Sequence, residues 1–135
     1  MIEKINHIAI AVRSLEEHIP FYRDVLNLEF RCTEVVEDQK VRLAVFRVGE
    51  TQIELLEPTA ADSPILAFIE KRGEGMHHIS YQVDDIEKQI AELKAKQVRM
   101  IDQSPRSGAH GSRIAFLHPQ SSAKVLSELT QEVDR

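Results

Sequence analysis

Two histidines and two glutamates occupy matching positions in this chain, and side chains of these types could together bind a divalent metal ion. When the second half of the chain is laid over the first, His7 aligns with His78, and Glu54 aligns with Glu128 at a slightly larger offset. Imidazole nitrogens and carboxylate oxygens are ligands for cobalt, nickel, zinc, manganese and iron ions, so the set does not select one of these metals. We therefore expect one divalent ion per chain, with coordination positions left open for oxygen atoms of a substrate.

The residues between these four also align, which indicates an internal repeat. The offset that aligns the two histidines also aligns Val12 with Val83, Glu16 with Glu87, Ile19 with Ile90, and the tripeptide 42–44 with the tripeptide 113–115. The offset grows only where a short turn at 48–51 is replaced by a longer one at 118–124. Because hairpin loops tolerate changes of length, we interpret the pattern as a duplication.

Each half of the chain predicts the same order of elements: a strand, a helix and three further strands. Strands are expected at 5–12, 29–37, 40–48 and 52–57 in the first half, and at 76–83, 100–103, 112–118 and 124–130 in the second. Helices are expected at 14–27, 65–72 and 84–96. Ser14, followed three residues later by Glu17, predicts a capping box, and Pro20 predicts a kink or a late helix start.

These elements predict an α+β fold of two repeated βαβββ modules that form a curved mixed sheet around a metal-centred cavity. Module one covers residues 5–57, a linker helix covers 64–72, and module two covers 76–131. We expect all three to belong to one domain over residues 1–135, because the length is that of a single domain.

Successive strand residues face opposite sides of a sheet, so the histidines can be assigned to faces. His7 shares a face with Ala9, and His78 shares a face with Ser80 and Gln82, which are small or polar residues suited to lining a cavity. The other four histidines are weaker candidates: His77 faces the other side of its strand, His18 lies on a helix, and His110 and His118 lie in loops where either could touch a ligand.

Composition excludes several classes of protein. The net charge of −5 argues against a nucleic-acid-binding surface, which requires a basic face. The single Cys32 excludes an internal disulfide. No apolar run approaches the roughly 18 residues of a membrane-spanning helix, and the first residues lack the apolar stretch of a signal peptide. We therefore expect a cytoplasmic protein without a membrane or nucleic-acid partner.

Four stretches resemble the methylmalonyl-CoA epimerases, a branch of the vicinal-oxygen-chelate (glyoxalase) superfamily. The stretches are NHIAIAV, TQIELLEP, GEGMHHISYQV and GAHGSRIAFLHPQS, and the resemblance extends from His7 to about Thr130. It implies the same four metal ligands, an acyl-CoA substrate and a homodimer. Some family members have Gln where this chain has Glu54, and some have a glutamate base on the strand that carries Arg42 here.

The resemblance implies epimerisation of methylmalonyl-CoA through an enolate that a divalent ion stabilises, with Glu54 and Glu128 as catalytic residues and Glu128 favoured. Arg42 and Arg113 could pair either with an anionic group of the substrate or with surface acids. Glyoxalase I is an alternative with the same metal set, but the stretch at 108–121 favours the epimerase. A non-catalytic binding or resistance protein is an alternative from another class. Such proteins often lose metal ligands, whereas all four are present here.

Overall fold

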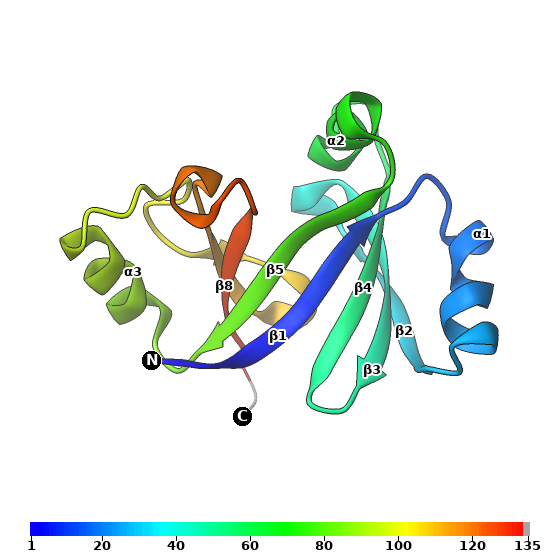
Figure 1. Ribbon diagram of the computed structural model, residues 1–135, viewed down its shortest axis with the longest axis horizontal. Coiled ribbons are helices and arrows are strands. Elements are labelled where there is room, and N and C mark those ends of the chain that lie inside the picture. Colours follow the sequence, from blue (N-terminus) through cyan, green and yellow to red (C-terminus); the bar gives the residue numbers. More distant parts are fainter. Residues whose placement is uncertain (134–135) are drawn as a thin grey trace. The chain divides into compact units, whose positions relative to one another are not determined.

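The computed structural model describes residues 1–133, and its elements follow the order expected for two repeated modules (Figure 1). The strands are β1 (Ile2–Ala11), β2 (Glu29–Val36), β3 (Val41–Val48), β4 (Thr51–Pro58), β5 (Gly75–Val83), β6 (Arg106–Ser107), β7 (Arg113–Leu117) and β8 (Ser127–Gln131). The α-helices are α1 (Leu15–Pro20), α2 (Pro64–Arg72) and α3 (Ile86–Ala95). Four short helical turns of 3₁₀ or π type are η1 (Phe21–Val25), η2 (Glu37–Gln39), η3 (Ala109–Gly111) and η4 (Pro119–Ser122). No helix among the described residues combines the length and apolar character needed to cross a membrane.

The chain packs into two compact units. The N-terminal unit is His7–His77, and the C-terminal unit is Met1–Asn6 together with the residues from His78 onward. The division falls within β1, so the first residues of this strand belong to the C-terminal unit and the rest to the N-terminal unit.

In the N-terminal unit the strands follow the order β2-β3-β4-β1. Strand β1 runs parallel to β4 and places Ala9 opposite Glu54. Strand β3 runs antiparallel to β4 and places Val45 opposite Glu54 from the other side. Helix α1 packs over β3 and β4 through Leu15, which is fully buried with Phe46 and other apolar residues.

The C-terminal unit has the strand order β5-β8-β7-β6 and the same register. Strand β5 is parallel to β8 with Ser80 opposite Glu128, and β7 is antiparallel to β8 with Phe116 opposite Glu128. Each of these residues occupies the place that the aligned residue holds in the N-terminal unit, at the offsets found in the sequence. The internal repeat and the α+β fold of two βαβββ modules are therefore confirmed.

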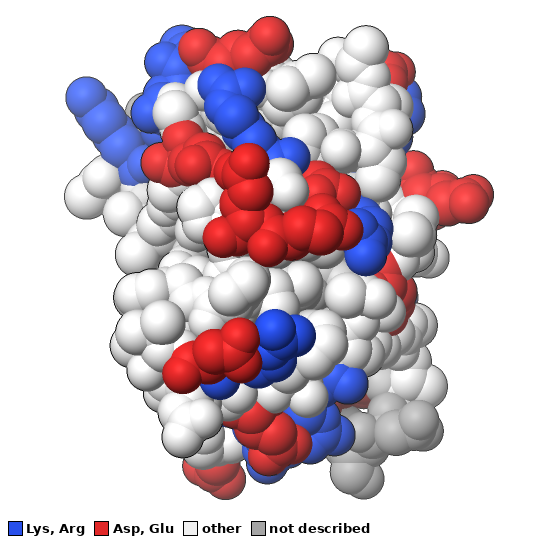
Figure 2. Space-filling view, turned by 90° about the vertical axis from the view of Figure 1, so that its right-hand side faces the viewer, with Lys and Arg blue, Asp and Glu red and all other residues white. Residues whose placement is uncertain are grey.

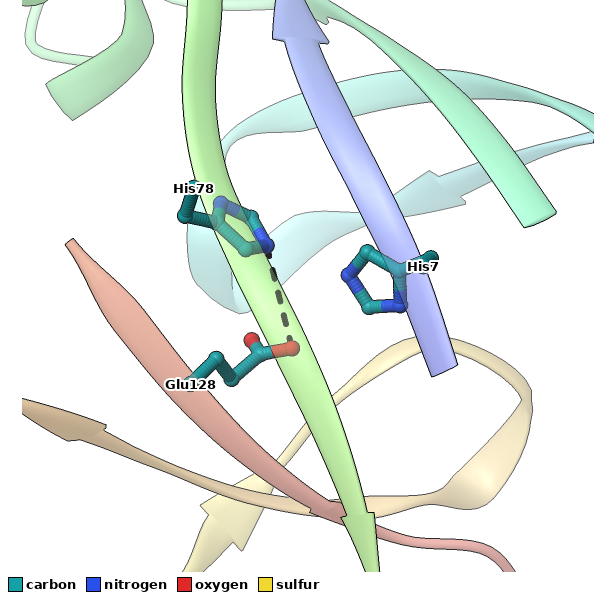
Figure 3. A group of neighbouring side chains, drawn as sticks. All are labelled: His7, His78 and Glu128. Atoms are coloured by element: carbon teal, nitrogen blue, oxygen red, sulfur yellow. Dashed lines mark ion pairs between the residues drawn. The ribbon is translucent and has the colours of Figure 1, made fainter. Parts of the chain in front are cut away.

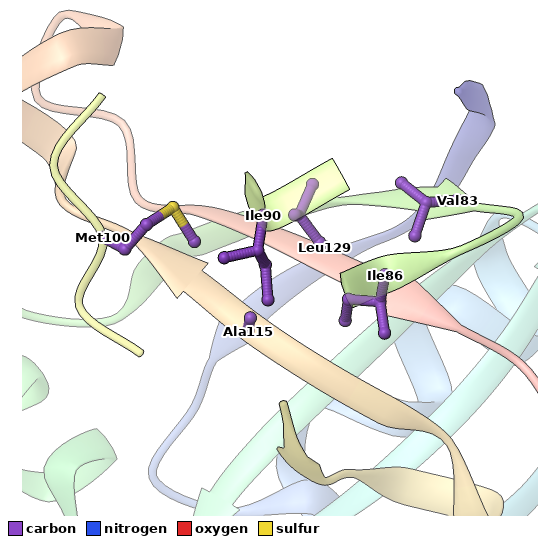
Figure 4. Packing of buried hydrophobic residues seen from close by; sticks show 6 residues of the cluster. All are labelled: Val83, Ile86, Ile90, Met100, Ala115 and Leu129. Carbon is purple, nitrogen blue, oxygen red and sulfur yellow. The ribbon is translucent and has the colours of Figure 1, made fainter. Parts of the chain in front are cut away.

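Helix α3 covers the sheet of the C-terminal unit with one apolar side. Its N-cap residue Asp85 accepts a hydrogen bond from the backbone of Lys88 at 3.1 Å, as expected for an aspartate at this position. The buried cluster between the helix and the sheet contains Val83, Ile86, Ile90, Met100, Ala115 and Leu129 (Figure 4). This core fixes β5 and β8, the two strands that carry His78 and Glu128.

The capping box predicted at the first helix is wrong. The side chain of Ser14 makes no capping hydrogen bond; its hydroxyl lies 3.3 Å from the carboxylate of Glu16 instead. The backbone N–H of Leu15 donates to Glu57 of β4 at 2.7 Å, so a carboxylate from the sheet satisfies the start of the helix. The α-helix ends at Pro20, which lacks an N–H, and the chain continues as the π-type turn η1.

Two strand predictions in the second half also need correction. Strand β8 begins at Ser127 rather than at residue 124, because Ala123 and Lys124 have positive φ angles of 56° and 67° that no strand accommodates. No strand forms at 100–103, where Met100 makes only an isolated bridge to Leu117. The strand between α3 and β7 is instead the two-residue β6, which lies at the end of the strand order of this unit.

Candidate metal centre and active site

The N-terminal unit holds a buried histidine–glutamate pair. His7 lies on β1 and Glu54 on β4, and these neighbouring parallel strands place Glu54 opposite the residue two positions after His7. The imidazole Nδ1 lies 3.4 Å from the carboxylate Oε2. His7 is 7% exposed and Glu54 is 5% exposed. The two residues predicted as ligands from the first module are therefore brought together.

The C-terminal unit holds the equivalent pair. His78 on β5 and Glu128 on β8 are 5% and 3% exposed, and His78 Nε2 lies 3.7 Å from Glu128 Oε1 (Figure 3). The polar face predicted for β5 is confirmed, because Ser80 and Gln82 are buried beside His78 along the strand. All four predicted ligands thus occur as two similar pairs, one in each unit.

The separations within the two pairs suit donor atoms that share an ion. Ligand atoms about 2.1 Å from one metal ion lie roughly 3.0–3.4 Å apart at coordination angles between 90° and 109°. The observed separations of 3.4 Å and 3.7 Å are close to this range. Buried carboxylates require compensation by hydrogen bonds, a positive partner or a metal ion, so the composition and the burial of each pair both fit a divalent cation.

The imidazole of His78 has an aromatic neighbour that the sequence motifs did not reveal. The ring of Phe116 meets it edge to face, with 5.3 Å between centroids and 89° between planes. The guanidinium of Arg106 lies 5.4 Å from the centroid of the same Phe116 ring. Phe116 therefore restricts the orientation of the imidazole while its own ring is covered by Arg106.

Arg42 does not share the face of Glu54. Strand β3 places Arg42 opposite Glu57, which faces the other side of the sheet, and the guanidinium pairs with Glu16 at 3.2 Å and Glu57 at 3.7 Å. The β3 residues on the Glu54 side include the buried Leu43 and Val45. Strand β3 therefore offers no carboxylate there as a second base.

Arg113 likewise pairs with an acid of its own unit, since its guanidinium lies 2.5 Å from Glu87 of α3. Figure 2, which looks onto the side where Figure 1 draws α1, shows acidic and basic side chains next to one another. Of the two roles considered for Arg42 and Arg113, the structure shows the pairing with surface acids.

The remaining histidines have other surroundings. The ring of His77 packs against Phe68 of α2 with 4.9 Å between centroids. His118 accepts a hydrogen bond from the backbone of Gln120 at 3.0 Å at the start of η4, and His110 occupies an exposed turn with a φ of 56°. These contacts give His77 and His118 structural roles in their own segments.

The segment that leads into β5 is fixed by Glu74. Its carboxylate accepts a hydrogen bond from the backbone N–H of Arg13 at 2.6 Å and lies 3.0 Å from His18 Nε2. The Arg13 N–H, and to a smaller degree His18, holds the pKa of the Glu74 carboxyl below its usual value. Glu74 thereby ties the start of β5 to the loop that follows β1.

We expect the substitution Glu74→Gln to destabilise the protein near neutral pH by no more than about 1 kcal/mol, because solvent screens this partly exposed carboxylate. A lowered pKa stabilises the folded state above the ordinary value of 4.5, and this stabilisation is lost as the pH falls through the folded-state pKa. Urea unfolding at pH 7 and at acidic pH should show the difference from wild type shrinking in acid. Glu70→Gln, at an exposed position of α2, is the control. A pH-independent difference would contradict the prediction.

Comparisons with known proteins cover nearly the whole chain. The family model described as the Glyoxalase/Bleomycin resistance protein/Dioxygenase superfamily matches residues 6–116. The chain is 43% identical over 128 residues to the uncharacterized protein YqjC of Bacillus subtilis (strain 168), with 95% of this chain and 91% of that protein aligned. It is 39% identical over 129 residues to the mitochondrial methylmalonyl-CoA epimerase of Mus musculus, with 95% of this chain and 72% of that protein aligned.

A solved structure gives the same result in three dimensions. A methylmalonyl-CoA epimerase in complex with methylmalonyl-CoA and NH4+ matches with a TM-score of 0.94 at 38% sequence identity. The match covers 99% of this chain and 97% of that one. The likeness therefore extends over both repeated modules.

Proposed function

Because the chain belongs to the methylmalonyl-CoA epimerase family of the glyoxalase, bleomycin resistance protein and dioxygenase superfamily, we propose that it epimerises methylmalonyl-CoA. The family expected from the sequence motifs is thereby confirmed. The observation that carries the proposal is the pair of buried histidine–glutamate sets at equivalent positions of two repeated units. Two such sets supply the ligands and the two carboxylates that inversion of an acidic carbon needs.

We propose that His7, Glu54, His78 and Glu128 hold one divalent ion, because the two pairs have the same donor types, burial and position in the two repeated units. The nitrogen and oxygen donors are compatible with cobalt, nickel, zinc, manganese or iron. When bound, such an ion supplies a Lewis acid that stabilises negative charge on the thioester oxygen of the substrate.

The two glutamates would carry the proton. The α-hydrogen of methylmalonyl-CoA lies between a thioester and a carboxylate, and its removal gives an enolate. Inversion requires one group to take this proton and a group on the other face of the carbon to return one. We assign these tasks to Glu54 and Glu128, which belong to the two related modules, with Glu128 as the principal carrier. The β3 residues on the Glu54 side include Leu43 and Val45, which cannot exchange a proton. This supports the assignment of proton transfer to the two glutamates rather than to a residue of β3.

The test is exchange of the α-proton of methylmalonyl-CoA with deuterium in D₂O, followed by mass spectrometry or NMR on the metal-loaded protein. Incorporation of deuterium at the α-carbon together with conversion of one C2 epimer into the other is expected. The hemithioacetal of methylglyoxal and glutathione serves as the parallel substrate, and it should be turned over poorly. Absence of exchange in metal-loaded protein would refute the proposal, and a dominant rate with the hemithioacetal would assign the chain to the glyoxalase reaction instead.

A further inference from the structure

The carboxylate of Glu128 receives a hydrogen bond from its own strand. The hydroxyl of Thr130, two residues further along β8, donates to Glu128 Oε1 at 3.0 Å. Thr130 in turn is hydrogen-bonded to the hydroxyl of Ser80 on β5. Ser80 is completely buried, and Thr130 and Glu128 are each 3% exposed. The three side chains form a short chain of hydrogen bonds in the interior of the C-terminal unit.

The direction of this chain follows from the number of available protons. A threonine hydroxyl carries one hydrogen, and in this arrangement it is directed to Glu128. The hydrogen in the contact between the two hydroxyls must therefore come from Ser80. Ser80 thus donates to Thr130 and Thr130 donates to Glu128, so that loss of Ser80 would leave Thr130 freer to turn away from the carboxylate.

The repeat shows that these hydroxyls are not required by the fold. Ala9 is opposite Glu54 in the N-terminal unit, as Ser80 is opposite Glu128 in the C-terminal unit. The residue two positions after Glu54 is Leu56, where the C-terminal unit has Thr130. Ala9 and Leu56 are both buried and carry no hydroxyl. The same strand pairing therefore forms with apolar residues at both places.

The hydrogen bond from Thr130 is made to the carboxylate of Glu128, whose orientation the backbone of β8 does not determine. The terminal torsion of a glutamate, which turns the carboxylate plane, has a broad energy profile and is not fixed by the backbone. A hydrogen bond from Thr130 to Oε1 fixes this torsion, and Oε1 is also the oxygen 3.7 Å from His78 Nε2. Residues that orient metal-binding carboxylates typically contribute 10- to 100-fold to metal affinity or activity.

We propose that Thr130, held by Ser80, is a positioning residue that orients the Glu128 carboxylate for metal binding and proton transfer and so distinguishes Glu128 from Glu54. This inference rests on the proposed role of Glu128 as a ligand and proton carrier. It concerns the orientation of the carboxylate, and its first consequence is measurable without substrate, as the affinity of the protein for a divalent ion.

The experiment compares Thr130→Val, which keeps the side-chain shape, with Thr130→Ser, which keeps the hydroxyl. Binding of Co²⁺ is measured by competition with a chelator, and kcat and KM for methylmalonyl-CoA are measured in parallel. Thr130→Val should weaken Co²⁺ binding about 10- to 100-fold and lower kcat more than it raises KM. Thr130→Ser keeps the donor hydroxyl and should therefore leave both quantities much closer to the wild-type values than Thr130→Val does. Thr33→Val, on the exposed part of β2, should change neither quantity.

A second variant protects the test against failure to fold. Thr130→Val alone leaves the buried Ser80 hydroxyl without its acceptor, which is itself destabilising. The double variant Ser80→Ala/Thr130→Val removes both hydroxyls. It places an alanine on β5 at the position where the aligned residue of β1 is Ala9. It should fold and still show the weakened Co²⁺ binding. Unchanged Co²⁺ affinity in this folded double variant would overturn the inference, as would a Thr130→Ser variant as impaired as Thr130→Val. A wild-type protein that binds Co²⁺ but has no epimerase activity would refute the proposed function and leave the affinity comparison decisive for the positioning role.

Discussion

Replacement of Glu128 by glutamine is expected to remove most of the epimerase turnover while part of the metal stays bound. Glutamine keeps an oxygen that can coordinate an ion but lacks the basic carboxylate. Removal of a general base typically lowers the rate by a factor of ~10²–10⁴. The measurement pairs steady-state epimerisation of methylmalonyl-CoA with elemental analysis of the same Glu128→Gln preparation, so that loss of catalysis can be separated from loss of metal.

The variant Glu54→Gln is the matched comparison, since Glu54 occupies the equivalent position opposite Ala9 in the other unit. It should retain the metal and appreciable activity, because the family resemblance includes members with glutamine at this position. Equal loss of activity in both metal-containing variants would favour two equivalent bases over a dominant Glu128. A Glu128→Gln rate near that of the wild type, with metal bound, would show that Glu128 is a ligand only.

Loss of the histidines is expected to have the largest effect on metal content. The purified protein should contain about one divalent ion per chain, and His7→Ala or His78→Ala should largely abolish it, because alanine supplies no donor atom. Elemental analysis after dialysis against trace metal gives the occupancy, and circular dichroism confirms that each variant is folded. Activity should fall together with the metal content.

His77→Ala is the control for this experiment. His77 is adjacent to His78 in the sequence but packs against Phe68 of α2. Its replacement should leave the metal content at the wild-type level. Full occupancy in the double variant His7→Ala/His78→Ala would eliminate the proposed ligand set, whereas loss of the ion in His77→Ala alone would show that metal content reports on local folding.

The repeat made the fold and the histidine–glutamate pairs predictable. An offset that is constant within strands and changes only in a hairpin loop requires equivalent strand pairings, and the structure has Ala9 opposite Glu54 and Ser80 opposite Glu128. Local signals were less informative where tertiary contacts compete with them. Ser14 has the sequence of a capping residue, but the nearby carboxylate of Glu57 satisfies the helix start instead.

The orientation of Arg42 could have been deduced from the hairpin turn. With Val48 opposite Thr51, antiparallel pairing places Arg42 opposite Glu57 and therefore on the side away from Glu54. The link between Ser80, Thr130 and Glu128 was harder to foresee. It needs the offset between two parallel strands that are far apart in the sequence, and that offset depends on the whole module rather than on any local motif.

The chain passes between the two compact units twice, once between His77 and His78 near the junction of the two repeats and once within β1, between Asn6 and His7. Met1–Asn6 belongs to the C-terminal unit, where the Asn6 amide donates to Gln82 at 3.0 Å and to Glu132 at 2.7 Å. A gene divided between its two repeats would therefore yield unequal fragments. The second fragment would lack a segment that its folded form contains, and the first would carry that segment without its partners. For the separately expressed halves to complement each other, the segment Met1–Asn6 of the first fragment must pack into the unit formed by the second fragment. Domain-swapped assemblies exchange elements in the same way.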